Sequence, residues 1–145
     1  MTSASGRCLC GAVRYKFDPG AVLWRGHCHC DSCRRACSAP FTTFFGVRAS
    51  AWRWFGPPPA AYNSSAWAER FFCPSCGAQM AYRSDKLPEE IHGYAVTLTD
   101  HGDFAAQAHF FTAEQVAWLH LADDLPRYSD GGKTLESTKR PRRLG

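Results

Sequence analysis

Eight cysteines constrain this chain more than any other feature, because all of them fall before residue 77 and form short clusters. The clusters are C-L-C-G from Cys8, C-H-C-D-S-C from Cys28 and C-P-S-C-G from Cys73, with Cys37 shortly after the second. An even number of cysteines in a short chain also fits a disulfide framework. The N-terminal segment has no apolar stretch typical of an export signal, and cytosolic thiols stay reduced, so we expect metal chelation instead.

The short spacings bring the sulfurs of each cluster together. Residues i and i+2 of an extended segment point to the same face, so both sulfurs of a C-x-C pair converge. In C-P-S-C-G, Pro74 fixes one backbone dihedral and Gly77 permits a positive one, which predicts a tight knuckle with inward-facing sulfurs. Two such pairs can complete a tetrahedral four-cysteine zinc site. Spacing alone does not say which pairs share an ion.

Composition and periodicity predict a mainly β domain. Of the 145 residues, 45% are hydrophobic and 21% charged, which is typical of a globular chain, and no apolar run approaches the ~18 residues of a membrane span. Alternating, aromatic and β-branched stretches predict strands over residues 13–17, 21–28, 41–47, 51–55, 67–72, 79–82 and 94–98. The Asp18-Pro19-Gly20 turn predicts that the first two of these strands pair as a hairpin.

Helical signals are few. Residues 32–36 are expected to form one helical turn after the second cysteine cluster. Thr112 followed by Gln115 is a capping-box pattern, which predicts a short C-terminal helix ending near Ala122. The expected domain therefore spans residues 1–128, a mainly β fold with zinc knuckles at its strand ends.

The positive charge of the chain is concentrated at its C-terminal end. The net charge is +4, and residues 129–145 carry five Lys/Arg against two acidic residues. A terminus of this composition is usually solvated and frayed. We therefore expect residues 129–145 to form a basic flexible tail, in preference to a segment that binds nucleic acid or a membrane.

The order of the motifs resembles a known family. The segments C-L-C-G, C-H-C-D-S-C-R-R and F-F-C-P-S-C-G occur in the order seen in the glutathione-dependent formaldehyde-activating enzyme family, also called the centromere protein V-like family. The stretch from His109-Phe110-Phe111 through Trp118 to Asp124-Leu125-Pro126-Arg127-Tyr128 is similar to the C-terminal pattern of that family. The resemblance covers roughly residues 5–128.

This resemblance implies a β-tent (Mss4-like) zinc-binding fold with two zinc ions per chain. Its four-cysteine structural site would contain the first and third clusters, Cys8, Cys10, Cys73 and Cys76. Its second site would contain Cys28, Cys30 and Cys33 with an open fourth position, and these three would be the catalytic ligands. The division agrees with the chemistry of zinc, because structural sites are closed and catalytic sites keep a vacancy.

The activity implied by the resemblance is a carbon–sulfur lyase reaction, in which formaldehyde and glutathione form S-hydroxymethylglutathione. The expected partners are thus a small-molecule thiol such as glutathione and a small aldehyde, in a cytoplasmic protein. Arg34 and Arg35 follow the second cluster and could neutralise a peptide carboxylate. Two alternatives remain: a non-enzymatic zinc-binding interaction module, and a metal or redox sensor that uses exposed thiolates.

Cys37 and Ser38 depart from the family pattern, in which a small hydroxylated residue and a glycine are usual. Cys37 could act as a fourth thiolate and close the second site, which would make that site structural. It could instead be a redox-active thiol, or a buried cysteine of the core, which we favour. His27 and His29 flank Cys28 and are expected to point away from the thiolates. His109 could be a substrate or supporting group, but a hydrogen-bonded structural histidine is the simpler expectation.

Overall fold

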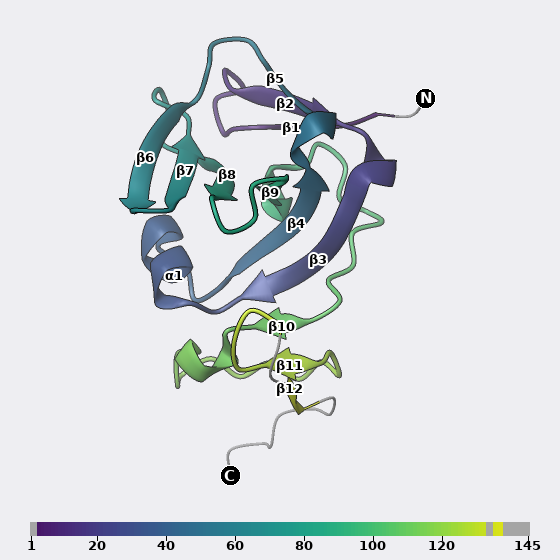
Figure 1. Ribbon diagram of the computed structural model, residues 1–145, viewed down its shortest axis with the longest axis vertical. Helices are drawn as coiled ribbons and strands as arrows, with labels where there is room; N and C mark the ends of the chain where they lie inside the picture. Colours follow the sequence, from purple (N-terminus) through teal and green to yellow (C-terminus); the bar gives the residue numbers. More distant parts are fainter. Residues whose placement is uncertain (1–2, 133–134, 138–145) are drawn as a thin grey trace. The chain divides into compact units, whose positions relative to one another are not determined.

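The computed structural model describes residues 3–132 and 135–137, and these residues form a mainly β fold (Figure 1). The strands are β1 (Ala4–Arg7), β2 (Arg14–Phe17), β3 (Val22–Cys28), β4 (Thr42–Arg48), β5 (Trp52–Phe55), β6 (Ala60–Ser65), β7 (Ala68–Phe72), β8 (Gln79–Ser84), β9 (Glu90–Tyr94), β10 (His109–Phe110), β11 (Arg127–Tyr128) and β12 (Leu135–Ser137). Helix α1 (Asp31–Cys37) follows β3. In the described part of the chain, no helix is long and apolar enough to cross a membrane.

The chain divides into two compact units. Unit 1 contains the residues up to Trp24 and Phe44–Phe104, whereas unit 2 contains Arg25–Thr43 and the residues from Ala105 onward. Strands β3 and β4 contribute residues to both units, because the divisions fall within them.

Unit 1 contains two antiparallel layers with an aromatic core. One sheet has the order β1-β2-β5, and the other runs β4-β9-β8-β7-β6. The rings of Tyr15 and Trp52 stack with centroids 4.1 Å apart, and Phe17 and Phe45 lie 4.9 Å apart. Tyr15 is fully buried. Burial of large aromatic side chains such as these dominates the energetics of a small core.

Unit 2 is built on the second half of β3. Strand β10 runs parallel to β3, pairing His109 with His27, and also parallel to β11, pairing His109 with Arg127. Strand β12 pairs antiparallel with β11. Figure 1 shows β10, β11 and β12 side by side. The consequence is that β10 places His109 between two parallel neighbours.

The mainly β fold and most of the predicted strands are confirmed, but the hairpin is wrong. Strand β2 pairs with β1 and β5, while β3 pairs with β10 in unit 2. The Asp18 turn itself forms, because the Asp18 carboxylate accepts the Gly20 amide at 2.8 Å at the start of a 3-10 turn. The turn signal was therefore local, and it did not specify the strand partner.

Two further expectations differ from the structure. Residues 94–98 do not form a strand: β9 ends at Tyr94, and Ala95–Thr97 is a 3-10 turn in which the Thr97 hydroxyl donates to the Tyr94 carbonyl at 2.7 Å. The C-terminal helix is a single 3-10 turn, Thr112–Glu114, preceded by Phe111 in a left-handed conformation. Trp118 is 69% exposed. None of the residues 112–122 is fully buried, so a longer helix lacks the burial that stabilises one.

The segment predicted as a basic flexible tail, residues 129–145, contains strand β12. In the same segment the Asp130 carbonyl accepts the Phe111 amide at 2.9 Å. Residues 133–134 and 138–145 of this prediction lie outside the described residues. The proposed boundary between a domain of residues 1–128 and a tail stays a prediction.

Candidate metal centres

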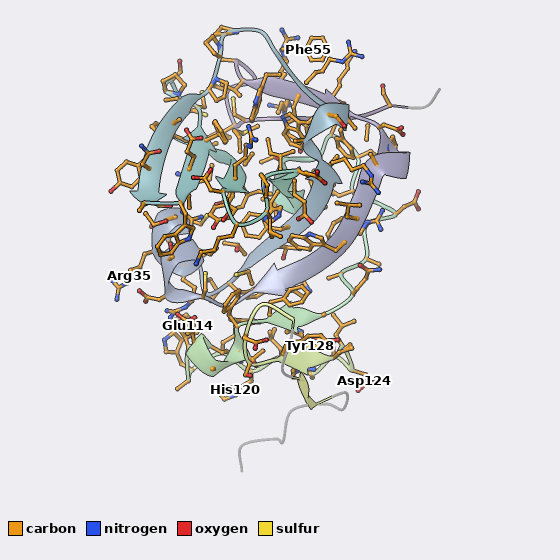
Figure 2. The ribbon with its side chains drawn as sticks, in the orientation of Figure 1. Arg35, Phe55, Glu114, His120, Asp124 and Tyr128 are labelled. Carbon is orange, nitrogen blue, oxygen red and sulfur yellow. The ribbon has the colours of Figure 1, made fainter. Side chains whose placement is uncertain are left out.

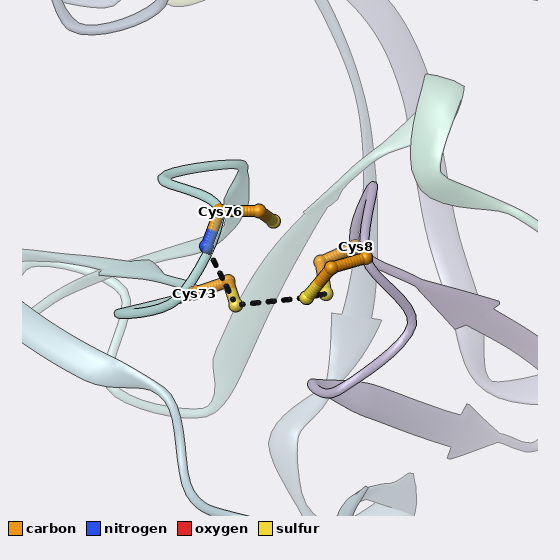
Figure 3. Close-up of side chains that lie close together, drawn as sticks. Cys8, Cys73 and Cys76 are labelled. Atoms are coloured by element: carbon orange, nitrogen blue, oxygen red, sulfur yellow. Dashed lines mark hydrogen bonds between the residues drawn. The ribbon is translucent and has the colours of Figure 1, made fainter.

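The first centre brings together two loops of unit 1 that are far apart in sequence. Cys8 and Cys10 lie in the loop between β1 and β2, while Cys73 and Cys76 lie in the loop between β7 and β8. All four sulfurs lie within 4.8 Å of one another (Figure 3). The Sγ atoms of Cys8 and Cys10 are 3.6 Å apart, and those of Cys10 and Cys73 are 3.8 Å apart.

Both loops are knuckles whose local hydrogen bonds turn the sulfurs inward. The Cys73 carbonyl accepts the Gly77 amide at 2.8 Å, and Gly77 has a φ of 78° that favours glycine. The Cys73 Sγ in turn accepts the Cys76 amide at 3.4 Å (Figure 3). In the first loop, the Cys8 carbonyl accepts the Gly11 amide at 3.2 Å, and Gly11 has a φ of 83°. The Cys8 Sγ accepts the Val13 amide at 3.3 Å. An amide that points at sulfur favours the thiolate form.

The sulfur spacing fits a tetrahedral zinc ion. Four sulfurs at Zn–S distances of about 2.3 Å lie about 3.8 Å apart, and the Cys8–Cys10 and Cys10–Cys73 separations in this centre are 3.6 and 3.8 Å. None of the eight cysteines forms a disulfide. The donor set is therefore a preformed four-thiol cage of the kind that holds structural zinc.

Thiol ionisation within the cage is uneven. The Ala78 amide, followed by that of Cys10, lowers the pKa of Cys76 to about 6. The pKa of Cys10 is raised to about 11, because the neighbouring sulfurs, first that of Cys8, outweigh the hydrogen bond from the Ala12 amide. Like-charged thiolates oppose one another in this way, and a bound cation reverses the effect.

The second centre lies in unit 2, where β3 meets α1. The sulfurs of Cys28, Cys30 and Cys33 lie within 4.8 Å of one another, with Cys28 and Cys33 at 3.7 Å. Cys30 is the N-cap of α1, and its Sγ accepts the Cys33 amide at 3.3 Å. Hydrogen bonds to the neighbouring sulfurs of Cys30 and Cys33, together with burial, raise the pKa of Cys28. These three thiols can therefore also hold a cation.

Cys37 does not belong to this group. It is the last residue of α1 and is half-buried. Among the described residues, the ligand atoms that lie within 4.8 Å of one another in this centre are the sulfurs of Cys28, Cys30 and Cys33 alone. The following residue, Ser38, has a φ of 50°, in the left-handed region that favours glycine. The glycine of the family pattern thus corresponds to a helix C-cap, which explains why a glycine is suited to that position.

The two arginines after the second cluster have different surroundings. Arg34 donates to the His29 carbonyl at 3.0 Å and to the Glu114 carbonyl at 3.0 Å, so it fixes α1 to the segment after β10. Arg35 pairs with Asp31 at 2.9 Å and its side chain is 79% exposed, extending outward from α1 (Figure 2). A role for either in binding a carboxylate stays a prediction, although Arg34 already has three acceptors in its own chain.

Two buried histidines, one of them in the second cysteine cluster, form a hydrogen-bonded chain with an aspartate, and only part of this chain could be predicted from the sequence. The Nε2 of His29 lies 2.8 Å from the Nδ1 of His109, whose Nε2 lies 2.9 Å from the Asp123 carboxylate. His29 is 0% exposed and His109 is 1% exposed. His109 is hydrogen-bonded, as expected, but Asp123 was not recognised. Its only signal in the sequence was a position next to the family-like stretch that begins at Asp124.

Comparison with known proteins identifies the family of this chain. The family model for glutathione-dependent formaldehyde-activating enzymes matches residues 3–114, so the chain belongs to that family. An uncharacterized lyase of Schizosaccharomyces pombe is 32% identical over 112 residues, which cover 74% of this chain and 78% of the yeast protein. A crystal structure of a Rhodobacter sphaeroides protein shares the fold, with a TM-score of 0.56, 24% identity, and coverage of 66% of this chain and 87% of that one.

Family membership and the lyase relative support a lyase-type function related to glutathione. The seven cysteines that the sequence predicts as ligands form the two sulfur groups, four in one and three in the other. The matched region includes both groups and His109, whereas Asp123 lies beyond it.

Proposed function

We propose that this chain is a zinc-dependent carbon–sulfur lyase-type enzyme that acts on a thiol–aldehyde adduct, with glutathione and formaldehyde as the substrates that the family name suggests. The observation that carries the proposal is the group of three sulfurs of Cys28, Cys30 and Cys33, which no fourth ligand atom joins in the described part of the chain. Catalytic zinc sites use three protein ligands and keep a position for substrate.

We further propose that the chain binds two zinc ions with different roles. The four sulfurs of Cys8, Cys10, Cys73 and Cys76 make a closed centre between two loops of unit 1, which suits a structural ion. The three-sulfur centre lies where a strand meets a helix, and two of its ligands, Cys28 and Cys30, are partly accessible. Because thiols must remain reduced to bind zinc, we place the protein in a reducing, cytoplasmic compartment.

The proposed reaction joins the sulfur of the thiol to the aldehyde carbon. The carbon–sulfur bond forms while the π bond of the carbonyl breaks, and the proton of the thiol is transferred to the carbonyl oxygen, which becomes a hydroxyl. A bound zinc ion would supply Lewis acidity toward the substrate thiol. The chain itself contributes by holding both reactants in one place.

The test must separate catalysis from the spontaneous reaction of glutathione with formaldehyde. Exchange spectroscopy with ¹³C-formaldehyde and glutathione measures the rate at which free aldehyde and adduct interconvert at equilibrium. We expect the zinc-loaded protein to accelerate this exchange in proportion to its concentration. Cys30→Ser should lose the acceleration, and the matched variant Cys37→Ser should retain it.

Two results would contradict the proposal. If the protein binds two zinc ions but leaves the exchange rate unchanged, then the family's named substrates are wrong for this chain, and a non-enzymatic zinc module becomes the better description. If Cys37→Ser loses an ion and the acceleration together, the second centre is a closed four-cysteine site.

A further inference from the structure

Every charged side chain on the outward face of the β1-β2-β5 sheet in unit 1 is positive. Successive residues of a strand point to opposite faces. In β2, Tyr15 and Phe17 are buried in the core, whereas Arg14 and Lys16 are exposed on the other side. The same alternation holds in the two neighbouring strands. We call the exposed side chains of this sheet the basic face, which consists of Arg7, Arg14, Lys16, Arg53 and Phe55.

The register of the strands arranges the four cations as two directly opposed pairs. Arg7 of β1 is opposite Arg14 of β2, and Lys16 of β2 is opposite Arg53 of β5. Directly opposed residues have Cβ atoms about 4.5–5.5 Å apart, and the two pairs are separated by about 7 Å along β2. Like charges directly opposite each other destabilise a sheet. The basic face therefore reduces the stability of unit 1 and requires a reason.

The positive charge of the basic face has no counter-charge within the described part of the chain. None of its four cations forms an ion pair there. Asp18 directly follows β2, but its Oδ1 is held in the next turn, 2.8 Å from the Gly20 amide. Arg7 donates only to neutral groups, the carbonyls of Cys8 and Leu9, each at 3.1 Å. The face is thus suited to a ligand that brings several negative charges.

An aromatic ring lies among these cations. Phe55 is directly opposite Arg14, and the Nζ of Lys16 lies 5.1 Å from the centroid of its ring. The ring is 38% exposed and extends outward from β5 (Figure 2). Proteins that bind single-stranded nucleic acids combine cations, which contact the phosphates, with exposed aromatic rings, on which the bases stack. The basic face presents both kinds of group on one sheet.

We propose that the basic face binds single-stranded nucleic acid, with phosphates at Arg14, Lys16 and Arg53 and a base stacked on Phe55. Complementary charge favours a chain of phosphates as the ligand, and stacking on the ring requires an unpaired base. A membrane surface fits less well, because the face has one apolar side chain, and its ring is more than half covered, so little apolar area can insert. This inference does not depend on the proposed lyase reaction.

Fluorescence anisotropy with a labelled oligo(dT) of about 12 nucleotides measures binding to the full chain. For single strands, the logarithm of the affinity falls with the logarithm of the salt concentration, with a slope of about −0.7 for each phosphate contact. Residues 129–145 carry five further Lys/Arg. Every variant retains them, so a comparison between variants isolates the contribution of the basic face.

The double variant Lys16→Gln/Arg53→Gln removes one opposed pair of cations. We expect its affinity for oligo(dT) to fall about tenfold or more at low salt, and the salt slope to become less negative by about 1.4, which corresponds to two contacts. Its thermal stability should not decrease, because the repulsion is relieved. Arg83→Gln/Lys86→Gln is the matched control: both residues are exposed in unit 1 outside the basic face, and the loss of charge is the same.

Phe55→Leu tests the stacking contact, because it keeps an apolar side chain and removes the ring. The affinity should fall about fivefold or more, as expected for the loss of one stacked base, while the salt slope stays the same. Tyr62→Leu is the matched control, since Tyr62 is an exposed aromatic residue on β6 and should not contribute. A duplex of the same length should bind more weakly than the single strand.

Several outcomes would overturn the inference. Absence of binding to oligo(dT) would do so, as would an equal loss of affinity in Arg83→Gln/Lys86→Gln, which would assign binding to overall charge. A duplex that binds as tightly as the single strand would exclude base stacking. Binding to vesicles of phosphatidylserine and phosphatidylcholine, without binding to oligo(dT), would assign the face to a membrane. Should Phe55→Leu not fold, the Lys16→Gln/Arg53→Gln variant and the duplex comparison decide the question.

Discussion

The Sγ atoms of Cys10 and Cys73 lie 3.8 Å apart, although 63 residues separate them along the chain. Cys10 belongs to the loop that joins β1 to β2 in one sheet of unit 1, and Cys73 belongs to the loop between β7 and β8 in the other sheet. An ion shared by these loops would connect the two sheets at one point. Such a connection closes a long loop of chain, which is unfavourable without a strong bond.

Replacing Cys73 or Cys10 with serine should therefore prevent unit 1 from folding. Structural zinc in small domains contributes about 10–16 kcal/mol of apparent binding free energy at neutral pH, compared with a net domain stability of about 5–15 kcal/mol. We expect Cys73→Ser and Cys10→Ser to give insoluble or molten protein. Near-ultraviolet circular dichroism and thermal melts measure the loss of packing around the aromatic core.

Cys37→Ser is the control for this experiment, because it makes the same chemical change outside both sulfur groups. It should melt like the wild type. A cooperative, wild-type-like transition in Cys73→Ser would show that the four-thiol cage is dispensable for the fold.

The cysteine groups could be predicted from the sequence because their geometry is mostly local. Gly77 with its positive φ and the amide of Cys76 turn the knuckle within five residues. The pairing of the strands is not local. Residues 14–17 have the alternation of a strand, but nothing in them indicates that β1 and β5, rather than β3, lie beside them. The choice of strand partner depends on tertiary packing, which the sequence of a single segment does not reveal.

The histidine chain was missed for the same reason. His29 and His109 are 80 residues apart, and Asp123 follows His109 by 14 residues in a segment without regular structure. Spacing along the sequence predicts which side chains lie close together only when the residues share one strand or one turn. These three residues instead come together because β10 inserts between β3 and β11, and that topology could not be derived from the sequence.

Cys30→Ser should remove about one zinc ion per chain and leave the protein folded. Serine is a good N-cap, so the substitution keeps the cap of α1 while it removes a thiolate. The four-thiol cage in unit 1 is unaffected. Metal analysis of purified protein and a thermal melt measure the two effects separately, and Cys37→Ser should change neither. Complete unfolding of Cys30→Ser would indicate that the second centre is also structural.

Ser38→Gly should stabilise the protein by about 1 kcal/mol. Ser38 ends α1 with a φ of 50°, and a left-handed conformation costs a residue with a Cβ about 1–2 kcal/mol relative to glycine. The amide of Ser38 donates to the Arg34 carbonyl, so the cap itself would be retained. Chemical denaturation measures the change, and Ser38→Ala, which keeps the Cβ, is the matched control. An equal gain in both variants would rule out backbone strain as the cause.

Stability should decrease as the pH falls from about 6.5 to about 4, because unit 2 contains two histidines that resist protonation, the half-buried His27 and the buried His29. Burial, and then the charge of His109, lower the pKa of His27 to about 4, and burial likewise lowers that of His29 to about 4. In the unfolded chain a histidine titrates near pH ~6.5. Between these values the unfolded state binds more protons, so the free energy of unfolding rises with pH, by at most about 1.4 kcal/mol per pH unit for each histidine.

His27→Asn isolates this contribution from the loss of zinc, which also occurs in acid because thiolates become protonated. The Nδ1 of His27 lies 2.8 Å from the Thr43 hydroxyl, and the side chain of asparagine can retain that bond without titrating. Between pH 6.5 and 4, the free energy of unfolding of the variant should depend less steeply on pH, by the contribution of one histidine. The zinc content, measured in parallel, should follow that of the wild type. Denaturant titrations at several pH values measure the slope. An identical slope in both proteins would assign the acid sensitivity to the metal centres and exclude His27 as its source.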